Sequence, residues 1–148
     1  MPTTQRLQNL LDRYCMDGLR HYWDVSREEA ELDFPTYMTR ILREKQMSRR
    51  DVLKRADVPE KYGYKILSGT QRSTDRDRLL QIFLAAHMNV EEVRRGLELY
   101  GLPALYPRNP RDNVFYLAFR NGLWSVDKVD EWLRYYGLKP LDVGIGDD

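Results

Sequence analysis

The chain has 148 residues, of which 42% are hydrophobic, and this is enough to bury one core of ordinary size. No run approaches the ~18 apolar residues of a membrane span, and the first residues lack the apolar segment of a signal peptide. We therefore expect a cytoplasmic protein with no membrane partner. The single Cys15 excludes an internal disulfide, in keeping with a reducing compartment, and is expected to pack on a helix face.

The net charge of +1 conceals a segregation of charge along the chain. Residues 1–39 carry four Lys and Arg against seven Asp and Glu, residues 40–78 carry twelve against six, and residues 79–148 carry eight against ten. The three net charges are therefore −3, +6 and −2. A basic block between acidic flanks is typical of a surface that faces phosphate, and a solvated helical face is the simpler alternative.

Helical periodicity begins at Thr4 and no segment has the pattern of a strand, so the sequence predicts an all-α fold. The first predicted helix, Thr4 to Tyr14, is amphipathic because its apolar residues recur at three- and four-residue spacing: Leu7, Leu10, Leu11 and Tyr14. Ser26 and Glu29 have the spacing of a capping box and predict the start of a second, short helix.

Five helices are predicted between residues 34 and 101, the first of them starting at Phe34-Pro35. Ser48 with Asp51 resembles a capping box, and Asn89 with Glu92 is a similar pair. The segment from Leu79 to Ala86 is too uniformly apolar for a surface helix. We expect it to be the central and most buried helix of the bundle.

After Gly101 three prolines within eight residues predict an extended connection, which Leu105 and Tyr106 are expected to hold against the body. Two further helices are predicted, residues 111–121 and 125–136, with apolar side chains such as Trp132 packed on the bundle. These patterns divide the chain into a helical extension (1–33), a helix-turn-helix domain (34–101), the connection with two helices (102–142) and a tail (143–148).

The segment from Phe34 to Ala86 has the layout of a helix-turn-helix. Ala56 is the small residue at which the second helix of the motif packs against the third, and Val58 is the apolar residue at the turn. Ile66-Leu67 anchors the following helix, and Gly69 provides a left-handed exit from it.

This layout resembles the Cro and phage-repressor type of DNA-binding domain, the Xre family, whose five helices would cover about Phe34 to Tyr100. The Leu-Tyr-Pro-Arg stretch at residues 105–108, followed by two helices, also resembles a subgroup of small bacterial regulators. The resemblance implies a dimeric, sequence-specific transcriptional regulator. Such a protein would insert a recognition helix, about residues 59–67, into the major groove of double-stranded DNA.

The resemblance also implies roles for individual residues. Four positions near the start of the recognition helix would read bases: Glu60, Lys61, Tyr62 and Lys65. Six positions would hold phosphates: Ser48, Arg49, Arg50, Thr70, Gln71 and Arg72. Gly63 departs from the family pattern, which has a buried Ile or Val there, and predicts either a looser helix or a gap filled by Tyr62 and Tyr64.

The sequence offers no candidate active site. His21 and His87 have no carboxylate or thiol at ligand spacing, so no metal or cofactor is expected. Aromatic residues, however, make up 11% of the chain and cluster near Trp23 and near Trp124 and Trp132. Because such residues dominate protein interfaces, an alternative stays open: a protein-binding adaptor on a helix-turn-helix scaffold, in a signalling or phage-defence assembly. The location of the +6 charge distinguishes the two functions: a charge centred on the recognition helix favours DNA binding, and a charge spread over the domain favours the adaptor.

Overall fold

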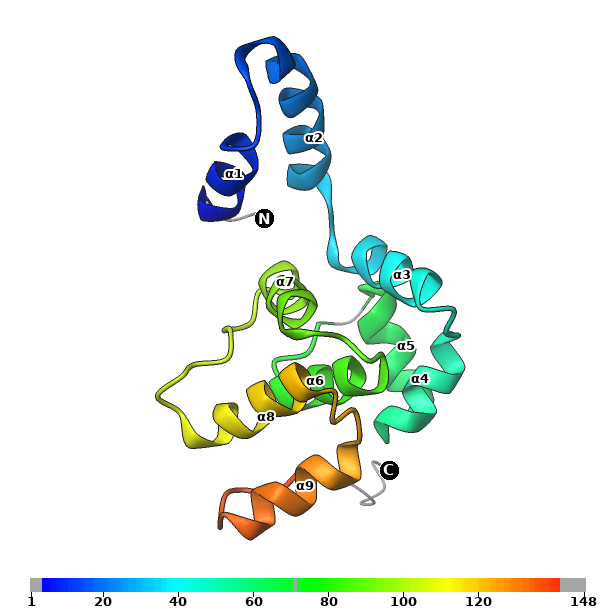
Figure 1. Cartoon of the computed structure of the whole chain (residues 1–148). Coiled ribbons are helices and arrows are strands. Elements are labelled where there is room, and N and C mark those ends of the chain that lie inside the picture. The colour runs from blue at the N-terminus through cyan, green and yellow to red at the C-terminus, as the bar shows by residue number, and fades with distance from the viewer. Residues whose placement is uncertain (1–3, 71, 142–148) are drawn as a thin grey trace.

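A computed structural model describes residues 4–70 and 72–141, apart from the side chains of residues 29–31. Every regular element in these ranges is helical, so the all-α prediction is confirmed, and none of these helices has the length and apolar character needed to cross a membrane. The predicted tail, residues 143–148, lies outside the described residues. The elements, shown in Figure 1, are α1 (Thr4–Leu11), the 3-10 turn η1 (Met16–Gly18), α2 (Leu19–Glu31), α3 (Phe34–Glu44), α4 (Arg49–Ala56), α5 (Glu60–Ser68), α6 (Arg76–Ala85), α7 (Val90–Tyr100), α8 (Pro110–Asn121) and α9 (Val126–Tyr135).

Side-chain caps set the starts of the helices in the bundle. Asp33 accepts a hydrogen bond from the Thr36 amide (2.9 Å) at the start of α3, and hydrogen bonds from the side chain and backbone of Thr36 lower the pKa of Asp33. Ser48 caps α4 by accepting from the amide of Asp51 (3.1 Å). The predicted Asn89–Glu92 capping box is present in both directions at α7.

Helix α6 is the centre of the bundle, as predicted. Every residue from Arg78 to Ala86 is buried, because α4, α7 and α9 pack around this helix. Gln81, the neutral polar side chain in that run, donates from Nε2 to the carbonyl of Ala56 (2.9 Å), which ties α6 to the end of α4. This bond satisfies a polar group inside the core.

The connection after α7 is held by polar contacts of its backbone. Arg76 donates to the carbonyls of Pro103 and Ala104, and the buried Asp112 accepts from the Tyr106 amide (2.9 Å) and pairs with Arg76. Leu105 packs partly buried against the core, as expected, whereas the expectation that the Tyr106 side chain holds this segment was wrong. That side chain is 57% exposed because the backbone amide makes the attachment.

Helices α8 and α9 pack on each other and back on the bundle, as predicted. Phe115 and Val129 are fully buried. Trp132, however, is 45% exposed and was wrongly expected to pack on the core. Val129 and Leu133 occupy the core side of α9, and Trp132 lines a groove between α8 and α9 instead.

The N-terminal hairpin, η1 with helices α1 and α2, stands apart from the bundle in Figure 1 and has no fully buried side chain among those described. Helix α2 begins at Leu19, so Ser26 lies inside it and was wrongly predicted to cap its start. Its hydroxyl donates to the carbonyl of Trp23 (3.1 Å), a bond that such residues form within helices. Cys15 is exposed in the connection between α1 and η1 instead of packing on a helix face.

Candidate nucleic-acid interface

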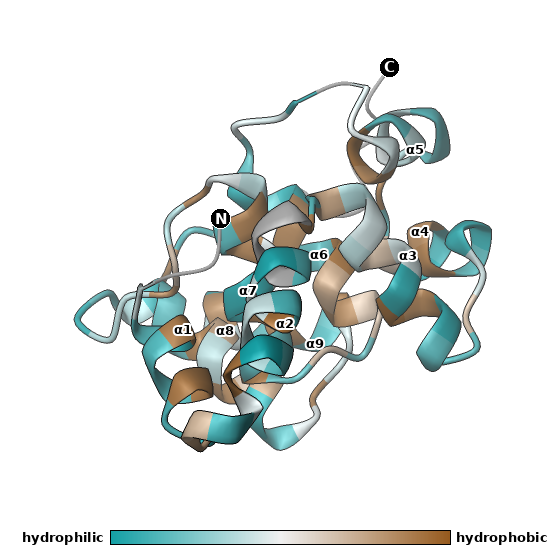
Figure 2. Cartoon of the chain, turned by 90° about the horizontal axis from the view of Figure 1, so that it is seen from above, coloured by the Kyte–Doolittle hydropathy of each residue, from teal (hydrophilic) through white to brown (hydrophobic). Residues whose placement is uncertain are grey.

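Helices α4 and α5 form a bihelical unit with a three-residue connection. Asp57 ends α4 in the left-handed conformation (φ 57°), Val58 is buried, and Pro59 precedes the first residue of α5. Gly69 then ends α5 with φ 77°, a conformation that glycine adopts without strain. Figure 2 shows α5 at the rim of the molecule, so one side of this helix is open to solvent.

Gly63 brings α5 close to α4. A Cβ at this position would lie 2.4 Å from Cδ2 of Leu53, which is far inside van der Waals contact. The space beside Gly63 is therefore occupied by Leu53. The predicted gap was wrong, and neither Tyr62 nor Tyr64 is needed to fill it.

Three of the four predicted base-reading residues share the exposed face of α5. Glu60, Lys61 and Lys65 are exposed, and Lys61 and Lys65 lie one helical turn apart. Tyr62 points elsewhere: it is half-buried, and its hydroxyl lies 2.6 Å from Oγ of Ser73 in the following loop.

Tyr64 belongs to the same face and was missed as a candidate. It lies four residues after Glu60, three after Lys61 and four before the exposed Ser68, and it is partly exposed. That spacing was visible in the sequence. Tyr64 was instead expected to fill a gap beside Gly63, a space that Leu53 occupies.

Five of the six predicted phosphate-holding residues lie among the described residues. Ser48, Arg49 and Arg50 lie together at the start of α4, where Nη2 of Arg49 donates to Oγ1 of Thr39 (3.1 Å) and Arg50 is exposed. Thr70 follows α5, with Oγ1 3.0 Å from Oγ of Ser68.

Arg72 points toward the body of the protein. Its guanidinium donates to the carbonyl of Tyr100 and lies 4.8 Å from the centre of the Tyr100 ring. Gln71 lies outside the described residues.

The twelve cations of residues 40–78 separate into a structural set and an exposed set. Five of them bond to or approach groups outside α3 to α5: Lys45 pairs with Glu92, Arg55 donates to Ala85, Arg72 to Tyr100, Arg76 pairs with Asp112, and the buried Arg78 approaches Asp75. The other seven form the exposed set on α3, α4 and α5: Arg40, Arg43, Arg49, Arg50, Lys54, Lys61 and Lys65. Arg55 and Arg72 are exposed too, but each is held by its bond to a backbone carbonyl outside these helices.

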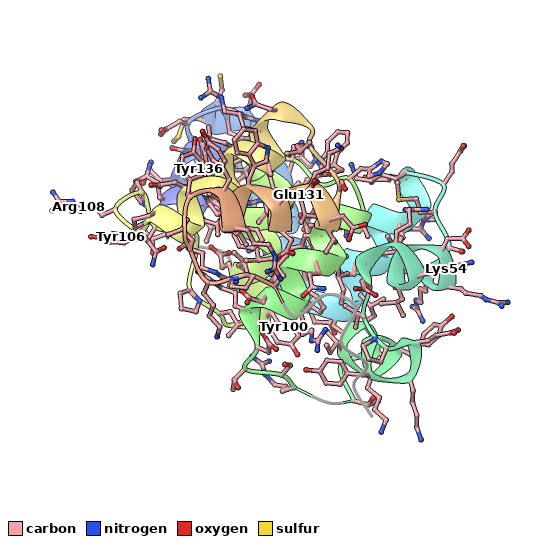
Figure 3. All side chains as sticks on the ribbon, turned by 90° about the horizontal axis from the view of Figure 1, so that it is seen from below. Lys54, Tyr100, Tyr106, Arg108, Glu131 and Tyr136 are labelled. Carbon is pink, nitrogen blue, oxygen red and sulfur yellow. The ribbon has the colours of Figure 1, made fainter. Side chains whose placement is uncertain are left out.

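The exposed set is a basic surface on three neighbouring helices, α3 to α5. Four acidic residues lie on the same helices or the turn between them, so seven cations against four acids give this surface a net charge of +3: Glu44, Asp51, Asp57 and Glu60. Figure 3 shows Lys54 projecting outward from α4, on the side of the molecule opposite to Tyr106 and Arg108. The positive charge of the central block is therefore concentrated beside α5.

His87 lies in the turn after α6, with φ 55°, and stacks on the indole of Trp124 at 4.8 Å and 15°. Partial burial, followed by the positive charges of Arg55 and Lys45, lowers the pKa of His87. Within the described residues, no group of three or more His, Cys, Asp and Glu side chains could hold a metal ion.

Comparison of the chain with protein-family models, with curated proteins and with solved structures gave no match.

Proposed function

We propose that the protein is a sequence-specific DNA-binding regulator that inserts α5 into the major groove. The observation that carries the proposal is the division of the basic block. The exposed set, whose seven cations bond to no described residue outside α3 to α5, lies on these three helices, with Lys61 and Lys65 on the outer face of α5. An exposed helix with cations on one face and basic neighbours suits entry into a groove lined by phosphates.

The outer face of α5 carries groups suited to base edges. Lys61 and Lys65 would donate to guanine N7 and O6, and Glu60 would accept from the amino group of cytosine. Tyr64 would contact a thymine methyl group or a phosphate. Tyr62 would act indirectly, because its hydroxyl bond to Ser73 holds the loop after α5.

Most of the affinity would come from phosphate neutralisation. Arg49, Arg50 and Lys54 on α4 supply charge next to α5, and Ser48 and Thr70 add hydroxyl donors. Each phosphate contact by a cation releases counterions, so binding should weaken as the salt concentration rises. Arg72 would contribute by holding the loop, since its guanidinium is bonded to Tyr100.

The test begins with selection of bound sequences from a random DNA pool at about 0.15 M salt, where purely electrostatic binding fades. On the selected site, Lys65→Ala should cost about 1–3 kcal/mol and relax the preference at one base position. Arg50→Ala should weaken binding to all sequences alike and lower the salt slope by about one. Arg108→Ala is the matched control, because Arg108 is exposed on the opposite side of the molecule (Figure 3) and should leave affinity unchanged.

The adaptor alternative rests on the exposed aromatic side chains of α9 and its end. Trp132, Tyr135 and Tyr136 contact one another, with ring centres 4.9–5.9 Å apart, and all three remain exposed. If Lys65→Ala and Arg50→Ala leave DNA affinity unchanged while Trp132→Ala abolishes binding to a protein partner, the adaptor function replaces the DNA-binding one.

A further inference from the structure

A large apolar groove lies between α8 and α9, away from the basic surface on α3 to α5. Its volume is about 780 Å³. Its principal lining residues come from both helices and the segments that follow each: Val114, Leu117, Ala118, Leu123, Trp132 and Tyr136. Leu117 is 49% exposed and Trp132 is 45% exposed, so a contiguous apolar surface faces solvent. Surfaces of this kind mark interaction sites.

The N-terminal hairpin, in contrast, has apolar side chains but no core of its own in which to bury them. Helix α1 has 8 residues and α2 has 13, and none of their described side chains is fully buried. Helices of this length are marginal alone and need an apolar partner surface. Met16 in η1 and Trp23 in α2 are the most exposed large apolar side chains of the hairpin, at 90% and 52%. The hairpin therefore needs an apolar surface to pack against, and the bundle of its own chain does not provide one.

The two surfaces also carry opposite charge. Residues 4–32 have four Lys and Arg against six Asp and Glu, a net charge of −2, while residues 102–141 have six against four, a net charge of +2. Two of those six cations are paired within the chain, Arg111 with Asp77 and Arg134 with Asp130. Arg120 and Lys128 are exposed and lie one turn from the groove residues Leu117 and Trp132. An acidic occupant would meet these two cations at the rim.

We propose that the hairpin of a second copy of this chain docks into the groove, and that reciprocal docking closes a two-fold dimer. Trp23 is the anchor that enters the groove, next to Trp132 and Tyr136, since stacking of aromatic side chains stabilises such contacts. The acidic hairpin lies against Arg120 and Lys128. This proposal does not depend on DNA binding.

The fold favours a partner's hairpin over the chain's own. Only Leu32 and Asp33 connect α2 to α3, and two extended residues span about 7 Å. Figure 1 places the hairpin beyond α3 and places α9 at the opposite end of the bundle, with α6 between them. A single helix layer is about 10 Å thick, so this connection cannot carry the hairpin across the bundle.

The test uses the full chain and two variants at exposed positions, Trp23→Glu on the hairpin and Leu117→Glu in the groove. Sedimentation velocity over a concentration series, without DNA, should show a dimer for the wild type. Each variant should weaken dimerisation by at least about tenfold, the effect of losing one anchoring contact. Tyr106→Glu, at a position equally exposed but outside the groove lining, is the control and should leave the dimer unchanged. Circular dichroism confirms that every variant keeps its helical content.

Mixing the two variants identifies the occupant. The groove of the Trp23→Glu copy is intact and so is the hairpin of the Leu117→Glu copy, so an equimolar mixture should regain a heterodimer through one interface. A groove-to-groove dimer would show no such rescue, and that result would overturn the proposal. A wild type that remains monomeric at every concentration, or a Trp23→Glu variant that dimerises like the wild type, would overturn it as well.

Discussion

Replacing Gly63 by alanine tests whether close approach of α5 to α4 is what this position requires. In an ordinary helix interior the change would stabilise the protein by about 1 kcal/mol through helix propensity. Here the new Cβ would lie 2.4 Å from Cδ2 and 2.9 Å from Cδ1 of Leu53. Leu53 is itself fully buried, so its side chain has no free space to move into.

The clash should outweigh the gain in propensity. Overpacking a close-packed core typically costs about 1–3 kcal/mol, and a methyl group placed this close belongs at the upper end of that range. Gly63→Ala should therefore lower the free energy of unfolding by about 1–2 kcal/mol. For a domain of this size that corresponds to a fall of about 2–4 °C in Tm for each kcal/mol.

A double-mutant cycle with Leu53→Ala tests whether the contact with Leu53 is the cause of the destabilisation. Leu53→Ala alone should cost about 2–5 kcal/mol because it leaves a cavity in the core. In that background the clash is gone, so Gly63→Ala should stabilise the protein by about 1 kcal/mol through propensity. Urea denaturation of the four proteins gives the cycle. A Gly63→Ala change that stabilises the wild type, or that has the same sign in both backgrounds, refutes the close-approach argument.

Three further predictions concern caps and polar contacts. Asp33→Ala should lower the free energy of unfolding by about 1 kcal/mol, because it removes the α3 cap. Since the pKa of Asp33 is lowered in the folded protein, the stabilisation from its carboxylate is present above the ordinary value of 3.8 and is lost as the pH falls through the folded value. Urea denaturation of the variant at decreasing pH should therefore lack that acid-dependent loss of stability. The lowered pKa of His87 makes its protonation destabilising, so the Tm of the wild type should fall below pH 6.5. His87→Asn should flatten this fall, since asparagine tolerates the φ of 55° at this position. A wild-type Tm that rises on acidification to pH 5.5 would contradict the prediction. Asp112→Ala should cost about 2–4 kcal/mol in chemical denaturation because it removes a buried carboxylate bonded to Arg76 and to the Tyr106 amide, and a loss below 1 kcal/mol would mean that these contacts add little.

Local signals in the sequence were sufficient to predict the helices of the bundle. The continuous apolar run at residues 79–86 could only be accommodated at the centre, and the Asn89–Glu92 pair marked the start of α7 at the residue where it begins. Proline and glycine marked the connection after α7 in the same way. These signals act over a few residues, so they can be interpreted without knowledge of the tertiary structure.

Side-chain direction required the tertiary structure. Ser26 has the spacing of a cap but lies inside α2, because the preceding 3-10 turn already starts the helix. Arg72 appears in the sequence as one more cation in a basic block, yet the approach of Tyr100, 28 residues later, turns it inward. Trp132 is apolar enough for a core, but Val129 and Leu133 occupy the core side of α9. For Arg72 the deciding partner is distant in sequence, whereas for Ser26 and Trp132 it is the position of the residue along or around its own helix.

Gly63 does not by itself count against a recognition role for α5. Gly63, Ile66 and Leu67 are the buried residues of this helix, and they lie on one side of it. At 3.6 residues per turn, the other side is formed by Lys61, Tyr64, Lys65 and Ser68, and Glu60 is exposed because it is the first residue of the helix. A larger residue in place of Gly63 would change how far α5 stands from α4, whereas the identity of the outward side chains would stay the same. The capacity of α5 to bind DNA therefore depends on that outer face and its basic neighbours on α4, and these are the residues that the proposed DNA-binding measurements alter.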